Sequence, residues 1–194
     1  MATFRTPKCL IGVLACAALL GACLSCTNTL DPSVDGPADA GSEGGAGSLP
    51  TCSSFAQTPS SYVVCPEPLD YQAAAFDCMR RGATLAAIGS QPENDFVATN
   101  GGNVANDDLW LGGTRDDSYV WRWPDGTVFW RGETDGAAEN GSFVSWFPGE
   151  PNDASTVTTD PERCLALRVN RTAWNDRACS LQLPYVCEQA TPTP

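Results

Sequence analysis

The 194-residue sequence is long enough for one domain of ordinary size with shorter flanking segments. Its formal net charge of -12 at pH 7 would repel a phosphate backbone, so we exclude nucleic acid as a partner. The sequence contains no histidine, which excludes an imidazole-bound zinc site and the ordinary Ser-His-Asp and Cys-His catalytic arrangements.

The first residues are typical of an export signal. Arg5 and Lys8 precede an uncharged apolar stretch, which is short for a membrane span and suits the apolar part of a signal peptide. The stretch ends at Leu20-Gly21-Ala22-Cys23, which resembles the lipobox of bacterial lipoproteins. We therefore predict a signal peptide over residues 1–22, lipidation of Cys23, and a location in the bacterial cell envelope or on the cell surface. Ordinary cleavage nearby, which would give a secreted protein, and an uncleaved signal-anchor are the alternatives.

The next segment is predicted to be a flexible acidic linker over residues 23–49. It consists mainly of Asp, Gly, Ala, Ser and Pro and has almost no large apolar side chain with which to form a core. We predict a folded domain over residues 50–189 and a disordered tail over residues 190–194. Contact with a membrane is expected through the lipid anchor only.

Ten cysteines divide between the leader region and the folded domain. The six in the domain predict three disulfides in an exported protein, although their spacing leaves the pairing open. None of the six has the close spacing of zinc ligands. Cys26 is left over, either free or paired between chains. The six domain cysteines are Cys52, Cys65, Cys78, Cys164, Cys179 and Cys187.

Two helices are predicted early in the domain. Apolar residues recur at helical spacing from Tyr71 to Cys78, and Gly82 is a suitable helix stop. A short buried strand is predicted over residues 84–88. Ser90-Gln91-Pro92-Glu93 is a capping box with proline in the first turn, so a second short helix should begin there.

Strand patterns dominate the rest of the domain. Residues 109–111 form an apolar strand that ends at two glycines, and residues 119–130 have a hairpin pattern around the turn Pro124-Asp125-Gly126. Residues 164–169 and 184–188 also read as strands. Residues 131–159 lack periodicity, and a loop of that length is usually functional. Helices followed by strands predict an α+β domain.

Acidic and carboxamide side chains gather around the cysteines near the end of the domain. Glu150-Pro151-Asn152 is followed by Glu162, just before Cys164, and by Trp174-Asn175-Asp176, just before Cys179. Three carboxylates and two carboxamides drawn together with no lysine nearby repel one another unless a cation lies among them. Oxygen ligands of this kind suit calcium, so we predict calcium as the cofactor.

These residues resemble the C-type lectin domain family, in its long form with an extra amino-terminal hairpin. The resemblance covers nearly all of residues 52–188 and depends on several separate matches, including four cysteines in the family's order. It implies two helices packed on antiparallel sheets, a long calcium-binding loop and three disulfides. The implied pairings join Cys52 to Cys65, Cys78 to Cys187, and Cys164 to Cys179. The other matches are the helix ending at Cys78, Trp110-Leu111-Gly112-Gly113, Trp146, Glu150-Pro151-Asn152 and Trp174-Asn175-Asp176.

The resemblance also implies a function, namely carbohydrate binding through the metal. In the family, two neighbouring hydroxyls of a sugar complete the calcium coordination, and Glu-Pro-Asn accompanies equatorial 3- and 4-hydroxyls, as in mannose, glucose, N-acetylglucosamine and, in equivalent positions, fucose. Pro151 is expected to be cis. Single sugars should bind weakly, so multivalent display is expected. The implied calcium and sugar ligands are Glu150, Asn152, Glu162, Asn175 and Asp176.

Several departures and alternatives stay open. Asp160 is a rival for the role of Glu162. Some members have an auxiliary calcium, although Arg163 stands where that site usually has an acid. A protein-binding adhesin or structural surface domain, with calcium only holding the loop, is the alternative function. We do not expect the protein to be an enzyme. Glu150 and Glu162 could in principle serve as the acid and base of a glycosidase, but the metal would keep both carboxylates ionised. The auxiliary candidates are Asp116, Asp117, Asp153 and Asp160.

Overall fold

The computed structural model describes residues 50–156 and 159–190, and only the backbone of Ala190. The predicted signal peptide, the lipidation site at Cys23, the linker and nearly all of the tail lie outside the described residues. Within the described part of the chain, no helix has the length and apolar character needed to cross a membrane.

Both predicted helices are present. Helix α1 (Tyr71–Arg80) is capped by Asp70, whose carboxylate accepts a bond from the Ala73 N–H at 2.8 Å, and Gly82 follows it with a φ of 71°. Helix α2 (Gln91–Val104) begins at the capping residue Ser90, as predicted. It is longer than expected because it continues through Gly101, which lies so close to Leu109 that a Cβ atom would come within 2.3 Å of that side chain.

The strands form one mixed sheet in the order β1-β2-β10-β4-β5-β6-β7. Strand β8 pairs with β4 and β9, and β3 pairs with β10. Strands β10 and β4 are parallel, whereas the other pairs are antiparallel. In chain order the strands are β1 (Ser53–Gln57), β2 (Ser60–Leu69), β3 (Thr84–Leu85), β4 (Leu109–Arg115), β5 (Val120–Arg122), β6 (Val128–Arg131), β7 (Ala137–Ala138), β8 (Glu162–Arg168), β9 (Ala173–Ala178) and β10 (Leu183–Ala190).

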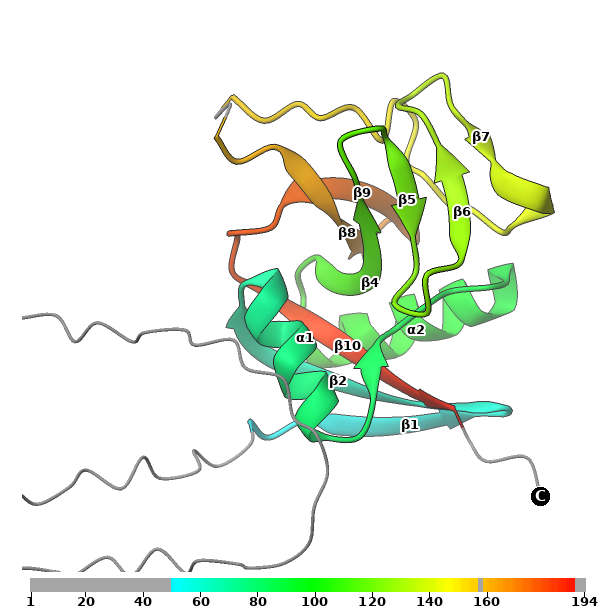
Figure 1. The fold of residues 1–194 in the computed structure, drawn as a ribbon. Helices are drawn as coiled ribbons and strands as arrows, with labels where there is room; N and C mark the ends of the chain where they lie inside the picture. The colour runs from blue at the N-terminus through cyan, green and yellow to red at the C-terminus, as the bar shows by residue number, and fades with distance from the viewer. Residues whose placement is uncertain (1–49, 157–158, 191–194) are drawn as a thin grey trace, which may run out of the picture. The chain divides into compact units, whose positions relative to one another are not determined.

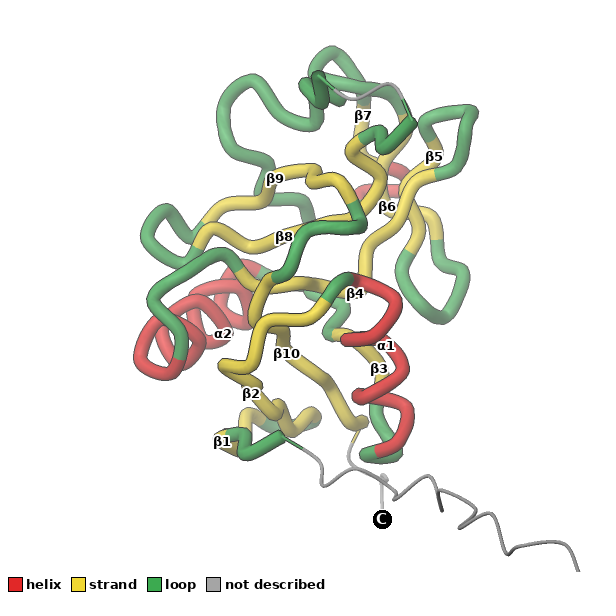
Figure 2. The backbone as a smooth tube through the Cα atoms, turned by 90° about the vertical axis from the view of Figure 1, so that its left-hand side faces the viewer, coloured by secondary structure: helices red, strands yellow, loops and turns green. Residues whose placement is uncertain are grey.

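The two helices flank β10, and the first strands lie beside the last. Figure 1 shows β1, β2 and β10 together, with α1 on one side of β10 and α2 on the other, and Figure 2 shows the same arrangement after a turn of 90°. The loop that precedes β8 lies at the opposite end of the domain, above β8 and β9 (Figure 1). The candidate site is therefore far from the strands where the described chain begins and ends.

Three disulfides are present, as predicted. Cys78 joins Cys187 and ties α1 to β10, while Cys164 joins Cys179 across β8 and the end of β9. Cys52 joins Cys65 at the amino-terminal hairpin. These are the pairings that the family resemblance implies. Each link contributes roughly 2–4 kcal/mol, mainly by restricting the unfolded chain.

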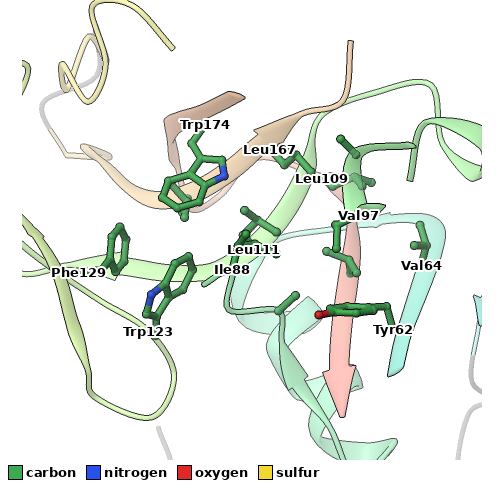
Figure 3. Close-up of a cluster of buried hydrophobic side chains, with 14 of the residues drawn as sticks. Tyr62, Val64, Ile88, Val97, Leu109, Leu111, Trp123, Phe129, Leu167 and Trp174 are labelled. Carbon is green, nitrogen blue, oxygen red and sulfur yellow. The ribbon is translucent and has the colours of Figure 1, made fainter. Parts of the chain in front are cut away.

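An aromatic core lies directly beneath the candidate site. Trp174 is fully buried and packs against Trp123, Phe129 and Trp146 with ring centroids 5.6–5.9 Å apart, and Figure 3 shows three of these rings facing one another. Its indole N–H donates to the carboxamide oxygen of buried Asn94 at 2.8 Å. Trp174 is therefore a core residue. Because Trp174 precedes Asn175 and Asp176, its packing fixes the backbone that carries those two residues.

Several strand boundaries differ from the predictions. Only Thr84–Leu85 of the strand predicted over residues 84–88 forms ladder pairs. Strand β4 continues through its two glycines. Gly112 lies so close to the Leu85 backbone that a Cβ there would be 2.6 Å from the Leu85 carbonyl oxygen, so this position requires glycine. The long segment over residues 131–159 contains β7 and a short 3-10 helix, Glu139–Gly141. Strand β9 was not predicted.

Candidate metal centre

The hairpin of β8 and β9 presents three of the five candidate ligands. Glu162 begins β8, and Asn175 and Asp176 lie in β9 opposite Ala166 and Leu165. Asp176 is 0% exposed and Asn175 is 4% exposed, although both are polar. Such groups are costly to bury unless they have a partner.

The Asp176 carboxylate holds the Glu-Pro-Asn segment against β9. Its oxygens accept hydrogen bonds from the backbone N–H of Asn152 at 3.1 Å and of Asp153 at 2.8 Å. The Glu150-Pro151 peptide bond is cis. Thr134 donates its hydroxyl to the carbonyl oxygens of Gly149 and Pro151, each at 3.1 Å. The loop is therefore fixed on both sides of the tripeptide.

Arg115, at the end of β4, connects this loop to the start of β8. Its side chain is only 4% exposed and forms an ion pair with Asp153. Its Nε donates to the Glu162 carbonyl oxygen at 3.0 Å, and Asp153 in turn accepts from the Glu162 N–H at 2.7 Å. Arg115 was not predicted from the sequence, because no spacing rule links an arginine at this position to residues 38 and 47 positions later in the chain.

Glu162, rather than its rival Asp160, lies with the candidate ligands. The Glu162 carboxylate accepts from the Ala154 N–H at 2.9 Å, and the same N–H contacts the Asn152 side-chain oxygen at 2.8 Å. The Asp160 carboxylate instead accepts from the Ser180 hydroxyl. The structure thus groups Glu162 with Asn152 through a shared loop N–H.

Burial and the neighbouring Asp176 carboxylate disfavour the ionised forms of Glu150 and Glu162. Burial raises the pKa of the Glu150 carboxyl to about 7, and the nearby Asp176 carboxylate adds to the rise. Burial, followed by the same Asp176 carboxylate, also raises the pKa of Glu162. One oxygen of Glu150, Oε2, is buried without a hydrogen-bond partner. A cation among these oxygens would relieve both the repulsion and the unpaired buried acceptor.

The side chains of this site supply enough oxygens for calcium only if the two carboxamides and a bound polyhydroxyl ligand also contribute. Within the described ranges, no three acidic or cysteine side chains come together closely enough to hold a metal by themselves. Calcium takes about 6–8 oxygens, including carboxamides and hydroxyls, so two carboxamides and a polyhydroxyl ligand suit this need. The all-oxygen chemistry and the unpartnered Glu150 oxygen are the observations that make the residues fit this ion.

The auxiliary candidates do not gather in one place. The Asp116 carboxylate accepts from the N–H groups of Ser118 and Val120 within a turn, and Asp117 forms an ion pair with Arg163. As described above, Asp153 pairs with Arg115, and Asp160 bonds to Ser180. Each acid already has its own partner, and the auxiliary calcium stays a prediction.

Calcium affinity should fall as the pH falls through about 7. If Glu150 is a ligand, the metal needs its ionised carboxylate, and below the raised pKa of about 7 a proton must be displaced first. The loss should approach about tenfold per pH unit below that value. Calcium titrations by calorimetry at about pH 8, 7 and 6 would measure it. The same affinity at all three values would show that Glu150 is not a ligand.

The family described as "Lectin C-type domain" matches residues 67–189. This chain belongs to the C-type lectin domain family. The mouse protein "C-type lectin domain family 4 member F" is 30% identical over 115 residues, which is 59% of this chain but 18% of the mouse protein. A "Lectin" of Pleurodeles waltl is 30% identical over 141 residues, covering 69% of this chain and 72% of that protein.

Solved structures share the fold of this lectin domain. The trimeric Kupffer cell C-type lectin receptor Clec4f has a TM-score of 0.58 at 26% identity, covering 73% of this chain and 85% of that chain. A calcium-dependent type II antifreeze protein, in its calcium-free form, has a TM-score of 0.55 at 26% identity, covering 71% and 97%. A calcium-independent type II antifreeze protein is also similar in fold, with a TM-score of 0.55 at 19% identity, covering 71% and 91%. The predicted α+β C-type lectin fold is confirmed, whereas calcium binding depends on the residues of the individual chain.

Proposed function

We propose that this domain is a non-enzymatic, calcium-dependent carbohydrate-binding module. Glu150, Asn152, Glu162, Asn175 and Asp176 would hold the calcium. The observation that supports this most is the buried Glu150 oxygen without a hydrogen-bond partner, beside Glu150 and Glu162 carboxyls whose pKa values are raised by burial and by Asp176. Among the similar structures, the cow CD23 carbohydrate-recognition domain was solved in the presence of a GlcNAc2Man3 oligosaccharide, with a TM-score of 0.58 at 23% identity, covering 74% of this chain and 99% of that chain.

The side chains suit a sugar diol because they offer both acceptors and donors. Bound calcium supplies coordination for two neighbouring hydroxyls. The Glu150 and Glu162 carboxylates accept hydrogen bonds from those hydroxyls, while the NH₂ groups of Asn152 and Asn175 donate to their oxygens. The carboxamide oxygens would serve a purely structural ion as well, so it is the NH₂ donors of the carboxamides that suit a sugar in particular.

The tripeptide is proposed to select sugars with equatorial 3- and 4-hydroxyls, such as mannose, glucose, N-acetylglucosamine and fucose. Exchanging its ends, with Glu150→Gln and Asn152→Asp together, reverses the order of donor and acceptor around the sugar. We expect the double variant to change its preference from methyl mannoside to methyl galactoside by about tenfold, the worth of one altered hydrogen bond to a charged group. Calorimetric titration with both sugars at saturating calcium measures the change.

The matched control for this double variant is Glu133→Gln with Asn106→Asp, which makes the same two exchanges, with no change in net charge, at exposed positions outside the tripeptide. It should keep the original preference. If the tripeptide variant still binds calcium and still prefers mannoside, the tripeptide does not select the sugar. If the unaltered domain binds calcium and no sugar, the alternative of a protein-binding or structural surface domain is correct.

We further propose that the domain acts on a bacterial surface, held by a lipid on Cys23 and extended by residues 23–49. Three disulfides fit an exported protein. A single site of this kind binds a sugar with a dissociation constant on the order of 1 mM, about -4 kcal/mol. Several domains on one surface would raise the avidity without new contacts. Mass spectrometry of the mature amino terminus tests the anchor, since an unmodified end would exclude it.

A further inference from the structure

A pocket rich in arginine adjoins the proposed calcium and sugar site. It has a volume of about 340 Å³. Its wall includes three arginines, which is unusual in a chain whose 23 acids outnumber its 11 basic residues. Asp107, Asp108 and Phe147 also line it. We call this the arginine pocket, and its arginines are Arg168, Arg171 and Arg177.

The arginine pocket and the candidate site are connected through the backbone, and the pocket's arginines affect the ionisation of the site's carboxylates. Arg177 directly follows Asp176 in β9. The carbonyl oxygen of Phe147, in the pocket wall, accepts a hydrogen bond from the Glu150 N–H at 2.9 Å. The Arg168 charge lowers the pKa of Glu150, against the larger effects that raise it, and Arg177 acts similarly on Glu162. A sugar at the calcium site would therefore lie beside this pocket.

Part of the pocket's positive charge is uncompensated. Arg177 forms an ion pair with Asp108 at 2.7 Å, yet its Nε is buried and has no hydrogen-bond partner. The Arg168 guanidinium lies 4.9 Å from the centroid of the Phe147 ring. Among the described residues, neither Arg168 nor Arg171 has a carboxylate within 4.0 Å. Two guanidinium groups thus remain available for an anion.

We propose that the arginine pocket binds a carboxylate or sulfate group carried by the glycan, so that the domain prefers acidic saccharides. This inference rests on the proposed function, because the calcium site is what places the sugar next to the pocket. Guanidinium groups suit this role since their planar N–H pairs match the two oxygens of a carboxylate or sulfate. The pocket has room for one small group or ring.

The test compares matched sugars on the mature chain with its disulfides formed. Methyl glucoside, methyl glucuronide and methyl glucoside 6-sulfate all keep the equatorial 3- and 4-hydroxyls. A second pair of test sugars consists of a disaccharide with glucuronic acid as its second ring and the corresponding neutral disaccharide. This pair places the negative charge one ring further from the calcium. We expect at least one acidic sugar to bind about tenfold tighter than its neutral partner at low salt, with the advantage shrinking as salt is added. The separate carboxylate and sulfate arms identify the preferred anion.

Variants assign this preference to the pocket. Arg168→Gln and Arg171→Gln should each remove most of the acidic advantage, while Arg80→Gln, which removes the same charge at the exposed end of α1, should keep it. Calcium is kept saturating, because Arg168 also favours the ionised form of Glu150. The neutral sugar reports separately on the calcium site in every variant.

Three results would overturn the inference. Equal calcium-dependent binding of acidic and neutral sugars would remove the acidic subsite and leave the proposed function intact. Calcium-dependent binding of neither kind would remove both. Tighter binding of an acidic peptide than of any acidic sugar, at the same arginines and without calcium, would mean that the pocket serves a partner other than the glycan.

Discussion

Asp176→Asn is expected to lower calcium affinity by more than about 100-fold, beyond the loss usual for an outer-shell partner, and to abolish calcium-dependent sugar binding. Asp176 is 0% exposed and accepts hydrogen bonds from two loop N–H groups. An asparagine keeps one acceptor, but it lacks the negative charge and turns an NH₂ group toward backbone donors. Such a mismatch costs about 1–3 kcal/mol of stability.

The matched control is Asp125→Asn, at an exposed turn where the aspartate bonds only to Thr127. It should keep the calcium affinity of the parent. Near-ultraviolet circular dichroism of both variants shows whether the aromatic core around Trp174 stays packed, which separates loss of a ligand from loss of the fold. Unchanged calcium affinity in a folded Asp176→Asn variant would exclude Asp176 as a ligand.

Removal of calcium is expected to lower the stability of the folded domain substantially. At a free calcium concentration about 100 times its dissociation constant, the bound ion stabilises the folded state by about 2.7 kcal/mol. For a domain of this size the melting temperature should fall by roughly 10 °C on chelation. Adding back calcium should restore it. Magnesium should not, because it prefers a smaller, strictly octahedral shell.

The destabilisation should be local. The segment around Asn152 and Glu162 holds its place through the Asp176 and Arg115 contacts, so its amide hydrogens should exchange faster without calcium. Strands β2 and β10, tied to α1 by the disulfide of Cys78 and Cys187, should exchange at an unchanged rate. Uniformly faster amide exchange over the whole domain would mean that the ion binds elsewhere. An unchanged melting temperature and exchange pattern would mean that no calcium binds.

Local signals in the sequence predicted most of the elements because their causes are local. The capping box at Ser90 and the turn at Pro124-Asp125-Gly126 determine their own surroundings. Strand β9 escaped prediction because Asn175 and Asp176 are polar yet buried, so the alternation expected of a strand is absent. We infer that this polar pair is buried because it belongs to the candidate site, and not because of the strand that carries it.

Only some residues of the candidate site could be predicted from the sequence. The tripeptide and the Trp174-Asn175-Asp176 run were visible as motifs, and their proximity to the Cys164 and Cys179 pair suggested one location. Arg115 and Arg168 were not visible, because their roles depend on contacts with Asp153 and Phe147 that only the folded chain creates. Long-range side-chain contacts leave no periodic signal in a single sequence.

Whether sugar binding depends on calcium is decided by calorimetric titration of the disulfide-bonded chain with calcium, followed by methyl mannoside. We expect heat from calcium uptake at a site that Asp176→Asn removes, and sugar binding only after that uptake. A chain that takes up no calcium, or that binds the sugar equally well in the presence of a chelator, would contradict this expectation.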